Sequence, residues 1–123
     1  LLQRNHKHQV DLTKYYSDAI KSVLKNYTSP KFYIFTDDFD WVSKNNFIET
    51  NYVFVKINQE KNSFLDMQLM SLCDVNIIAN SSFSWWSAWL NNKSDKTIFA
   101  PKNWFNDTSI ITDDLIPKSW NKI

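Results

Sequence analysis

Apolar residues along this chain follow two periodicities, one typical of helices and one typical of short buried strands. Helical spacing marks Ser63–Cys73, for example, while a compact run of branched and aromatic residues marks Tyr52–Ile57. Taken in order, the pattern predicts helices at Asp11–Asn26, Phe39–Asn46, Ser63–Cys73 and Ser81–Asn91, and strands at Lys31–Thr36, Tyr52–Ile57, Val75–Ala79 and Thr97–Ala100. Because strands alternate with helices, we expect an α/β fold, a Rossmann-like parallel sheet flanked by helices.

The same pattern predicts which side chains form the core. They come from the apolar faces of three helices and from the aromatic residues of the tail. The expected core positions are Tyr15, Ala19, Ile20, Val23, Leu24, Tyr27, Phe64, Met67, Leu69, Met70, Phe83, Trp86, Leu90, Trp104, Phe105 and Trp120. Ligands of parallel sheets bind beyond the carboxyl ends of the strands, so the segments that follow each strand are the candidates for function.

Composition excludes several classes of protein. With 43% hydrophobic residues and a net charge of +1, the chain is expected to fold, and it lacks the basic surface that nucleic acid would require. Cys73 is the single cysteine, so it cannot form an intramolecular disulfide. No apolar run reaches the roughly 18 residues of a membrane span. The absence of glycine excludes glycine-rich phosphate loops.

The chain length suits one domain. Residues 1–10 are polar and unpatterned, and we expect them to be a linker or loop remnant, with residues 11–123 forming the domain. Because the chain opens on Leu1 within this segment, we expect it to be a piece of a longer protein, entered in a loop.

The segment Asn80–Trp86 (NSSFSWW) carries the strongest chemical signal. An apolar strand runs into serines at the point where a helix begins, and a helix N-terminus presents unpaired N–H groups and a partial positive charge. Serine hydroxyls add donors, so the segment predicts an anion site suited to phosphate oxygens. The alternative is that Asn80 and the serines only cap the helix, because these are preferred N-cap residues.

Acidic residues provide two further candidates. The carboxylate of Asp66 can accept the paired N–H donors of a guanine edge, or it can stabilise the dipole of its own helix, the role that the sequence alone favours. Asp37 and Asp38, with Asp40 after them, resemble a metal-binding D-x-D motif, since hard cations prefer carboxylates. An Asp at the end of a strand also caps a following helix, and the sequence favours that role here.

The run Asn76–Asn91 (NIIANSSFSWWSAWLN) resembles the signature of the α-1,2-fucosyltransferases, glycosyltransferase family 11. Further blocks resemble the same family in the same order. They are Tyr15-Tyr16 with Ala19-Ile20, Phe35–Asp38 with Trp41, Asp66-Met67 with Leu69–Cys73, Ala100–Phe105, and Ile116-Pro117 with Trp120. The resemblance implies the C-terminal half of a two-domain, GT-B-type glycosyltransferase, with the donor site in a cleft between the domains.

The resemblance also implies an activity. A protein similar to this family moves L-fucose from GDP-fucose to a galactose-type hydroxyl of a glycan, with inversion and without a required metal or cofactor. Asp66 would contact guanine, and Ser81 and Ser82 would contact the diphosphate, while the catalytic residue is not identified. The full set of donor-binding residues implied is Asp66, Asn80, Ser81, Ser82, Phe83 and Ser84, with Asp37 and Asp38 in a second tier.

The implied partners are GDP-fucose, a glycan acceptor and an N-terminal domain of the same protein. The implied location is the cytoplasm, or the inner face of the membrane as a peripheral protein. The family has Gly where this chain has Ser87, a position expected to be a tight helix contact. Its H-x-R-R-x-D motif, whose arginines are expected to hold the β-phosphate, should precede this chain.

Two other functions remain open from the residues alone. One is a metal-dependent hydrolase or transferase that uses Asp37, Asp38 and Asp40. The other is a module that binds a nucleotide without catalysis.

Overall fold

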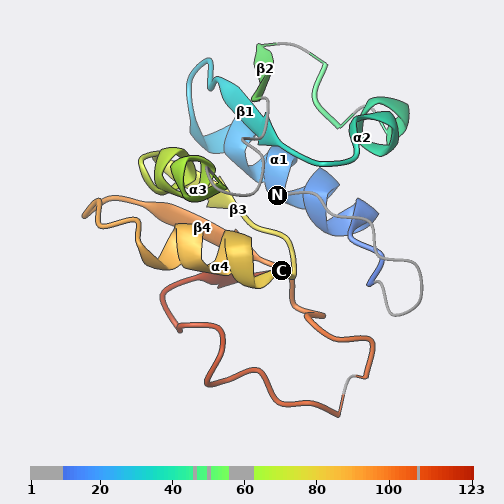
Figure 1. The fold of residues 1–123 in the computed structure, drawn as a ribbon, viewed down its shortest axis with the longest axis vertical. Helices are drawn as coiled ribbons and strands as arrows, with labels where there is room; N and C mark the ends of the chain where they lie inside the picture. Colours follow the sequence, from blue (N-terminus) through green and yellow to red (C-terminus); the bar gives the residue numbers. More distant parts are fainter. Residues whose placement is uncertain (1–9, 46, 50, 56–62, 108) are drawn as a thin grey trace.

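The computed structural model describes residues 10–45, 47–49, 51–55, 63–107 and 109–123. In chain order the elements are α1 (Thr13–Asn26), β1 (Phe32–Phe35), α2 (Phe39–Asn45), β2 (Tyr52–Val55), α3 (Ser63–Ser71), β3 (Val75–Ile77), α4 (Ser82–Trp89), β4 (Thr97–Ala100) and β5 (Asn121–Lys122) (Figure 1). The predicted α/β alternation is confirmed. The strand β5 was not predicted, and the last two residues of the expected strand Tyr52–Ile57 lie outside the described residues.

All the described strands run parallel, but they form two small sheets where the sequence predicted one. In the first sheet β1 pairs with β2, so that Phe32 lies opposite Tyr52. In the second sheet the order is β3-β4-β5, with Val75 opposite Thr97 and the short β5 beside the end of β4. Because the strands of each sheet are parallel, their carboxyl ends meet at one edge.

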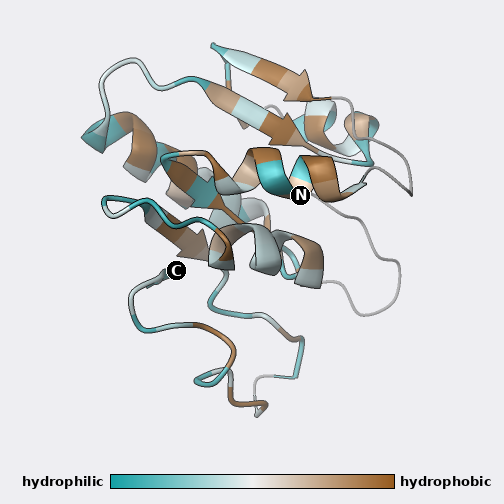
Figure 2. Ribbon diagram, turned by 60° about the vertical axis from the view of Figure 1, so that its left-hand side comes forward, coloured by the Kyte–Doolittle hydropathy of each residue, from teal (hydrophilic) through white to brown (hydrophobic). Residues whose placement is uncertain are grey.

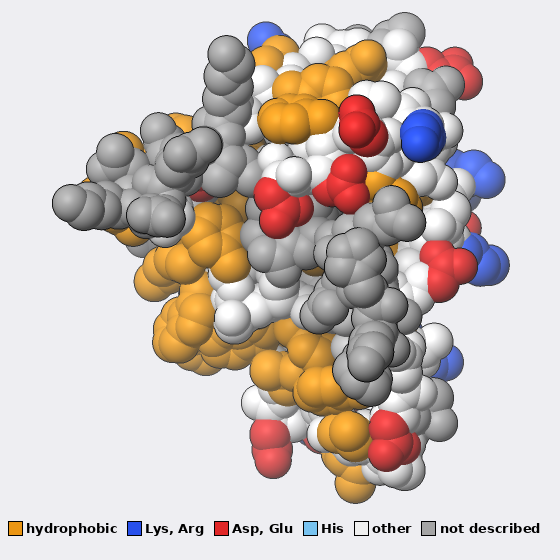
Figure 3. Space-filling model, turned by 45° about the vertical axis from the view of Figure 1, so that its right-hand side comes forward, with side chains coloured by type: hydrophobic (Ala, Val, Ile, Leu, Met, Phe, Trp, Pro, Cys, Tyr) orange, Lys and Arg blue, Asp and Glu red, His pale blue; other side chains and the backbone are white. Residues whose placement is uncertain are grey.

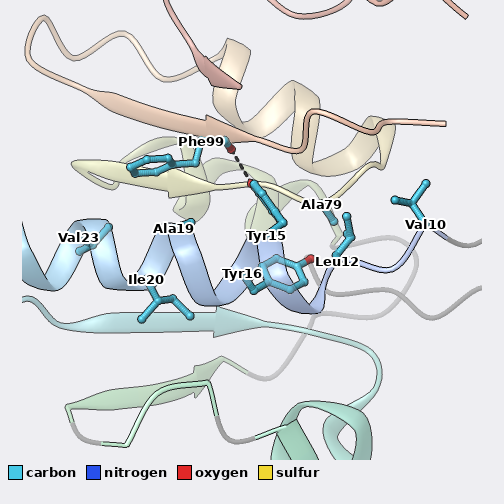
Figure 4. Packing of buried hydrophobic residues seen from close by; sticks show 9 residues of the cluster. All are labelled: Val10, Leu12, Tyr15, Tyr16, Ala19, Ile20, Val23, Ala79 and Phe99. Carbon is cyan, nitrogen blue, oxygen red and sulfur yellow. Dashed lines mark hydrogen bonds between the residues drawn. The ribbon is translucent and has the colours of Figure 1, made fainter. Parts of the chain in front are cut away.

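Alternation along β3 and β4 sends side chains to two opposite faces of the sheet. One face packs against α1, with Ala79 and Phe99 buried among α1 residues (Figure 4). The other face packs against α4, where Ile78 and Ile98 meet Ala88. Figure 2 agrees with this layering, since brown residues lie along the strands and the turns between elements are largely teal. The sheet β3-β4-β5 is therefore covered by α1 on one face and by α4 on the other.

The first core cluster, which we call the α1 core, begins before the helix itself. Val10 and Leu12 are buried in it, although the sequence placed residue 10 in the linker. Asp11 accepts a hydrogen bond from the Thr13 N–H at 3.0 Å and so supports the first turn of α1. The α1 core consists of Val10, Leu12, Tyr15, Tyr16, Ala19, Ile20, Val23, Ala79 and Phe99.

Several side chains expected in the core are instead exposed, mostly on α3 and α4. Trp86 is 47% exposed and Leu90 is 53% exposed, because the face of α4 that packs inward is the one that carries Ser84, Ser87 and Ala88. Phe64 and Leu69 on α3 are exposed as well. Figure 3 shows hydrophobic side chains gathered in a band along one side of the molecule. The other expected core residues found exposed are Leu24, Tyr27 and Phe105.

The tail after β4 packs onto the α4 face of the sheet. Trp104 and Trp120 are buried there, as predicted. Trp85 donates a hydrogen bond from Nε1 to the carbonyl of Leu115 at 2.7 Å. Among the described helices, none combines the length and the apolar character needed to span a bilayer.

Two adjacent tyrosines on α1 are buried but differ in their hydrogen bonding. The Tyr15 hydroxyl lies 2.7 Å from the carbonyl oxygen of Ile78 and 2.8 Å from that of Phe99, and so donates to the ends of β3 and β4 (Figure 4). Tyr16 Oη is the one buried side-chain polar atom in the described part of the chain that has no hydrogen-bond partner. Burial raises the pKa of both phenols well above the usual value, so both remain protonated donors.

Tyr15 and Tyr16 allow a matched test of whether the Tyr15 hydrogen bonds hold α1 against the sheet. Tyr15→Phe removes the hydroxyl donor from the carbonyls of Ile78 and Phe99, of which only the Phe99 carbonyl also accepts the Ile78 N–H at 3.1 Å. It is expected to destabilise the fold by about 1–3 kcal/mol. Tyr16→Phe removes a hydroxyl that has no partner, so it is expected to leave stability unchanged or raise it. Denaturant midpoints of the two variants measure the difference. Equal effects of the two substitutions would contradict this assignment.

Candidate functional site

The candidate site lies at the edge where the parallel strands end. The chain leaves β3 through Ile78 and Ala79 and reaches α4 by way of Asn80 and Ser81. Asn80 donates a hydrogen bond from Nδ2 to the carbonyl of Trp104 at 3.1 Å, which ties this turn to the loop after β4. The two loops that follow β3 and β4 are therefore held together at one edge of the sheet.

Ser81 is the N-cap of α4. Its backbone is extended, with φ −132° and ψ 147°, and its Oγ accepts the Ser84 N–H at 3.2 Å. Ser84 Oγ donates to the carbonyl of Ala79 at 3.1 Å, which leaves it free to accept from Ser81 Oγ at 2.6 Å. Ser84 is fully buried. Both hydroxyls thus hold the turn itself, so the capping role that the sequence left as an alternative is confirmed for Ser81.

Ser82 differs from its neighbours because its side chain is exposed at the first position of α4. In the described part of the chain, its hydroxyl makes no hydrogen bond. The N–H groups of Ser82 and Phe83 belong to the first turn of the helix, where no intrahelical acceptor exists. These three donors, with the partial positive charge of the helix N-terminus, are groups that suit an anion.

Buried asparagines brace the other end of α4, and sequence reasoning missed them. Asn76 on β3 donates to the carbonyl of Met70 at 2.6 Å and accepts from Asn91 Nδ2 at 2.7 Å. Asn91 also donates to the carbonyl of Cys73 at 2.7 Å. Asn76 interrupts the apolar run Val75–Ala79, and this could have signalled the contact. A buried side-chain amide requires hydrogen-bond partners.

Ser87 lies where α3 and α4 touch. It is fully buried, its Oγ donates to the carbonyl of Phe83 at 3.0 Å, and it lies 3.6 Å from the Met70 sulfur of α3. The expected tight helix contact is confirmed. A larger residue at this position would push α4 away from α3 and disturb the start of α4.

Asp66 lies in the first turn of α3 and is 1% exposed. It takes part in interactions within the chain. A guanine edge would reach this carboxylate only by displacing what covers it. Its contact with guanine therefore stays a prediction.

Asp37 and Asp38 follow β1. Asp38 Oδ1 accepts the Trp41 N–H at 3.1 Å, which makes Asp38 a cap of α2, the role that the sequence favoured. Asp37 and Asp40 are exposed. Among the described residues, no group of three or more His, Cys, Asp or Glu side chains is placed to hold a metal ion, so Asp37, Asp38 and Asp40 do not converge. The predicted roles of Asp37 and Asp38 as second-tier donor-site residues stay predictions.

Comparison with known proteins gives a consistent assignment. The family model of Glycosyl transferase family 11 matches residues 2–123. The chain is 36% identical over 117 residues to the Alpha-1,2-colitosyltransferase of Escherichia coli, a match that covers 94% of this chain and 40% of that protein. It is 39% identical over 102 residues to the O-antigen biosynthesis glycosyltransferase WbnK of Escherichia coli, covering 81% of this chain and 34% of that protein.

The chain spans at most 40% of the length of these two relatives. No solved structure matches it.

Substituting Ser81 and Ser82 one at a time distinguishes the serine that caps α4 from the serine whose hydroxyl is exposed. Ser81→Ala removes the N-cap of α4 and is expected to cost about 1 kcal/mol of stability. Ser82→Ala changes an exposed side chain without a partner and is expected to stay within about 0.5 kcal/mol of the parent protein. Urea denaturation of both variants measures this. A larger loss for Ser82→Ala than for Ser81→Ala would show that the cap has been misassigned.

Proposed function

The chain belongs to Glycosyl transferase family 11, and on that premise we propose that it forms the donor-binding part of a fucosyltransferase. In this proposal, the full protein moves L-fucose from GDP-fucose to a galactose-type hydroxyl of a glycan, with inversion. The observation that carries the proposal is the free N-terminus of α4, where Ser82 is exposed while Ser81 and Ser84 hold the turn.

The donors at the start of α4 suit the diphosphate of the sugar nucleotide. The N–H groups of Ser82 and Phe83 and the Ser82 hydroxyl can each donate to a phosphate oxygen. When the bond between sugar and diphosphate breaks, negative charge grows on the departing phosphate. Donors that are already oriented stabilise that charge without reorganisation. The buried bonds of Ser84 to Ala79 and to Ser81 keep these donors in place before the donor arrives.

Asp66 is proposed to select guanine. The helix α3 comes after β2 in chain order, as α4 comes after β3. A carboxylate can accept two N–H donors from guanine, an arrangement that adenine does not match. Because Asp66 is buried in this structure, the proposal requires that donor binding uncover it.

A second candidate concerns only the donated sugar. The similarity to an Alpha-1,2-colitosyltransferase favours colitose as an alternative to fucose. The site at α4 serves either donor, since it addresses the diphosphate and not the sugar. Parallel assays with both donors distinguish them, and turnover of the colitose donor alone would overturn the assignment to fucose.

The remaining parts of the proposal concern partners and location. The glycan acceptor and the remainder of the catalytic centre are assigned to sequence outside this chain, in agreement with the partial coverage of the relatives. The protein is proposed to act in the cytoplasm or at the inner face of the membrane. A module that binds nucleotide without catalysis would show GDP binding but no transfer by the full-length protein.

Ser82→Ala in the full-length enzyme is the direct test of the diphosphate site. Loss of one hydrogen bond to a charged group, about 1.5–3 kcal/mol, is expected to lower kcat/KM for GDP-fucose roughly 10- to 150-fold. The matched control is Ser94→Ala, which removes an exposed serine in the turn before β4, at the opposite end of the strands. Unchanged kinetics for Ser82→Ala, or equal losses in both variants, would refute the phosphate role.

Asp66→Asn tests the guanine contact with little change of shape. The preference for GDP over ADP, measured by calorimetry, is expected to fall roughly tenfold or more, because the neutral amide cannot accept both guanine donors. Asp95→Asn, an exposed acid in the turn before β4, should leave the preference intact. If Asp66→Asn lowers the denaturation midpoint while the GDP-to-ADP ratio stays the same, Asp66 is a structural residue.

A further inference from the structure

A cavity of about 620 Å³ lies between the two sheets and has no role in the proposed function. β1 lines one side of it and β3 lines the other. Ile20 and Val23 of α1 line it from one layer, and Leu69 and Met70 of α3 line it from another. At roughly 30 Å³ for each water, it could hold about twenty water molecules, far more than the small voids of a packed interior. Its lining is more apolar than polar, so a largely apolar segment would suit it.

Both strands that border the cavity have an unpaired edge. In the described part of the chain, β1 pairs only with β2, and β3 pairs only with β4. The backbone N–H and C=O groups on the facing edges therefore make no ladder bonds to another described strand, and an unpaired strand edge is a template for pairing with a further strand. A sheet of two strands, such as β1-β2, is also marginal by itself. The two edges face each other across the cavity as two sides of a slot.

The connection from α1 to β1 indicates which kind of segment fits the slot. The helix α1 leads into β1 and also packs under Val75 and Ile77 of β3, so it covers both sides of the slot (Figure 4). A helix that leads into a strand of a parallel sheet normally crosses over from a parallel strand of the same sheet. One side of β1 is already occupied by β2, and the other side is the slot.

We propose that the slot receives a β-strand from the part of the full-length protein that precedes α1 in sequence and lies outside these 123 residues. It pairs in parallel with β1 and β3 and joins the two sheets into one of order β2-β1-inserted strand-β3-β4-β5. The relatives extend well beyond the matched region, so the full-length chain has room for such a strand. The inference is independent of the proposed function.

The lining of the slot defines the strand that fits. The neighbouring strands have three or four residues, so a strand of similar length fills it. Side chains from α1 meet it on one face and side chains from α3 on the other. A strand covered on both faces is a continuous hydrophobic run and does not alternate with polar residues.

Insertion would also bring new residues to the candidate site. In a parallel sheet, the carboxyl end of the inserted strand lies between the ends of β1 and β3. It therefore emerges between the loop that carries Asp37 and Asp38 and the loop that carries Asn80 and Ser81. The residues that follow the inserted strand would complete the same edge of the sheet.

Disulfide trapping in the full-length protein tests the insertion. With Cys73→Ser to remove the native thiol, Ile34→Cys on β1 is combined with Val75→Cys or with Ile77→Cys on β3. Adjacent strands lie about 4.8 Å apart, whereas strands with one between them lie about 9.6 Å apart, beyond the roughly 7 Å limit for a disulfide. We expect no disulfide, read from intact mass, in either pair.

The control pair is Tyr33→Cys with Val53→Cys, two residues that lie opposite each other on β1 and β2. It is expected to form the disulfide under the same oxidation. A disulfide between β1 and β3 would mean that these strands pair directly, and it would overturn the proposal.

A second measurement needs no substitution in the slot. Backbone NOEs in the full-length protein should connect β1 and β3 to one and the same strand that precedes α1. NOEs that run directly from β1 to β3 would overturn the proposal even if the cysteine variants fail to fold.

Discussion

The hydrogen bond from the Ser84 N–H to Ser81 Oγ is the interaction on which the candidate site depends. It ends the turn after β3 and begins α4, so it decides which helix amides stay free. Ser81 has an extended backbone, and the two described residues with positive φ, Ser29 and Asn51, lie elsewhere. The turn therefore needs no glycine, which explains how a glycine-free chain can present backbone amides to an anion.

This turn is fixed from several directions, and that rigidity links the fold to the function. Tyr15 on α1 bonds to the carbonyls of Ile78 and Phe99 beneath it, and the buried asparagine pair Asn76 and Asn91 braces the far end of α4. Hydrogen-bond donors that are already oriented stabilise the negative charge that develops on the departing phosphate, because the protein does not have to rearrange around it. The buried polar contacts of this region thus serve both the stability of the layers and the orientation of the free amides.

Sequence patterns predicted the order of elements well, because helical spacing and short apolar runs are local signals. They also offered capping as the alternative role of Asn80 and the serines, a local interaction that the structure assigns to Ser81. They failed for Trp86, because the burial of a helix face depends on which side meets the sheet. The Asn76–Asn91 bond arises from a contact between distant segments, which no local pattern encodes. For Asp66, the sequence favoured a role at the helix dipole and the family resemblance implied a guanine contact, but neither revealed its burial.

The central claim is that the amides at the start of α4 bind the diphosphate of the donor. An NMR titration of the full-length protein with GDP, and separately with guanosine, tests it most directly. The account predicts that the backbone amides of Ser82 and Phe83 shift strongly with GDP and little with guanosine, which lacks the phosphates. If both amides stay unmoved while saturating GDP shifts resonances elsewhere, the diphosphate binds at another place and the account is contradicted.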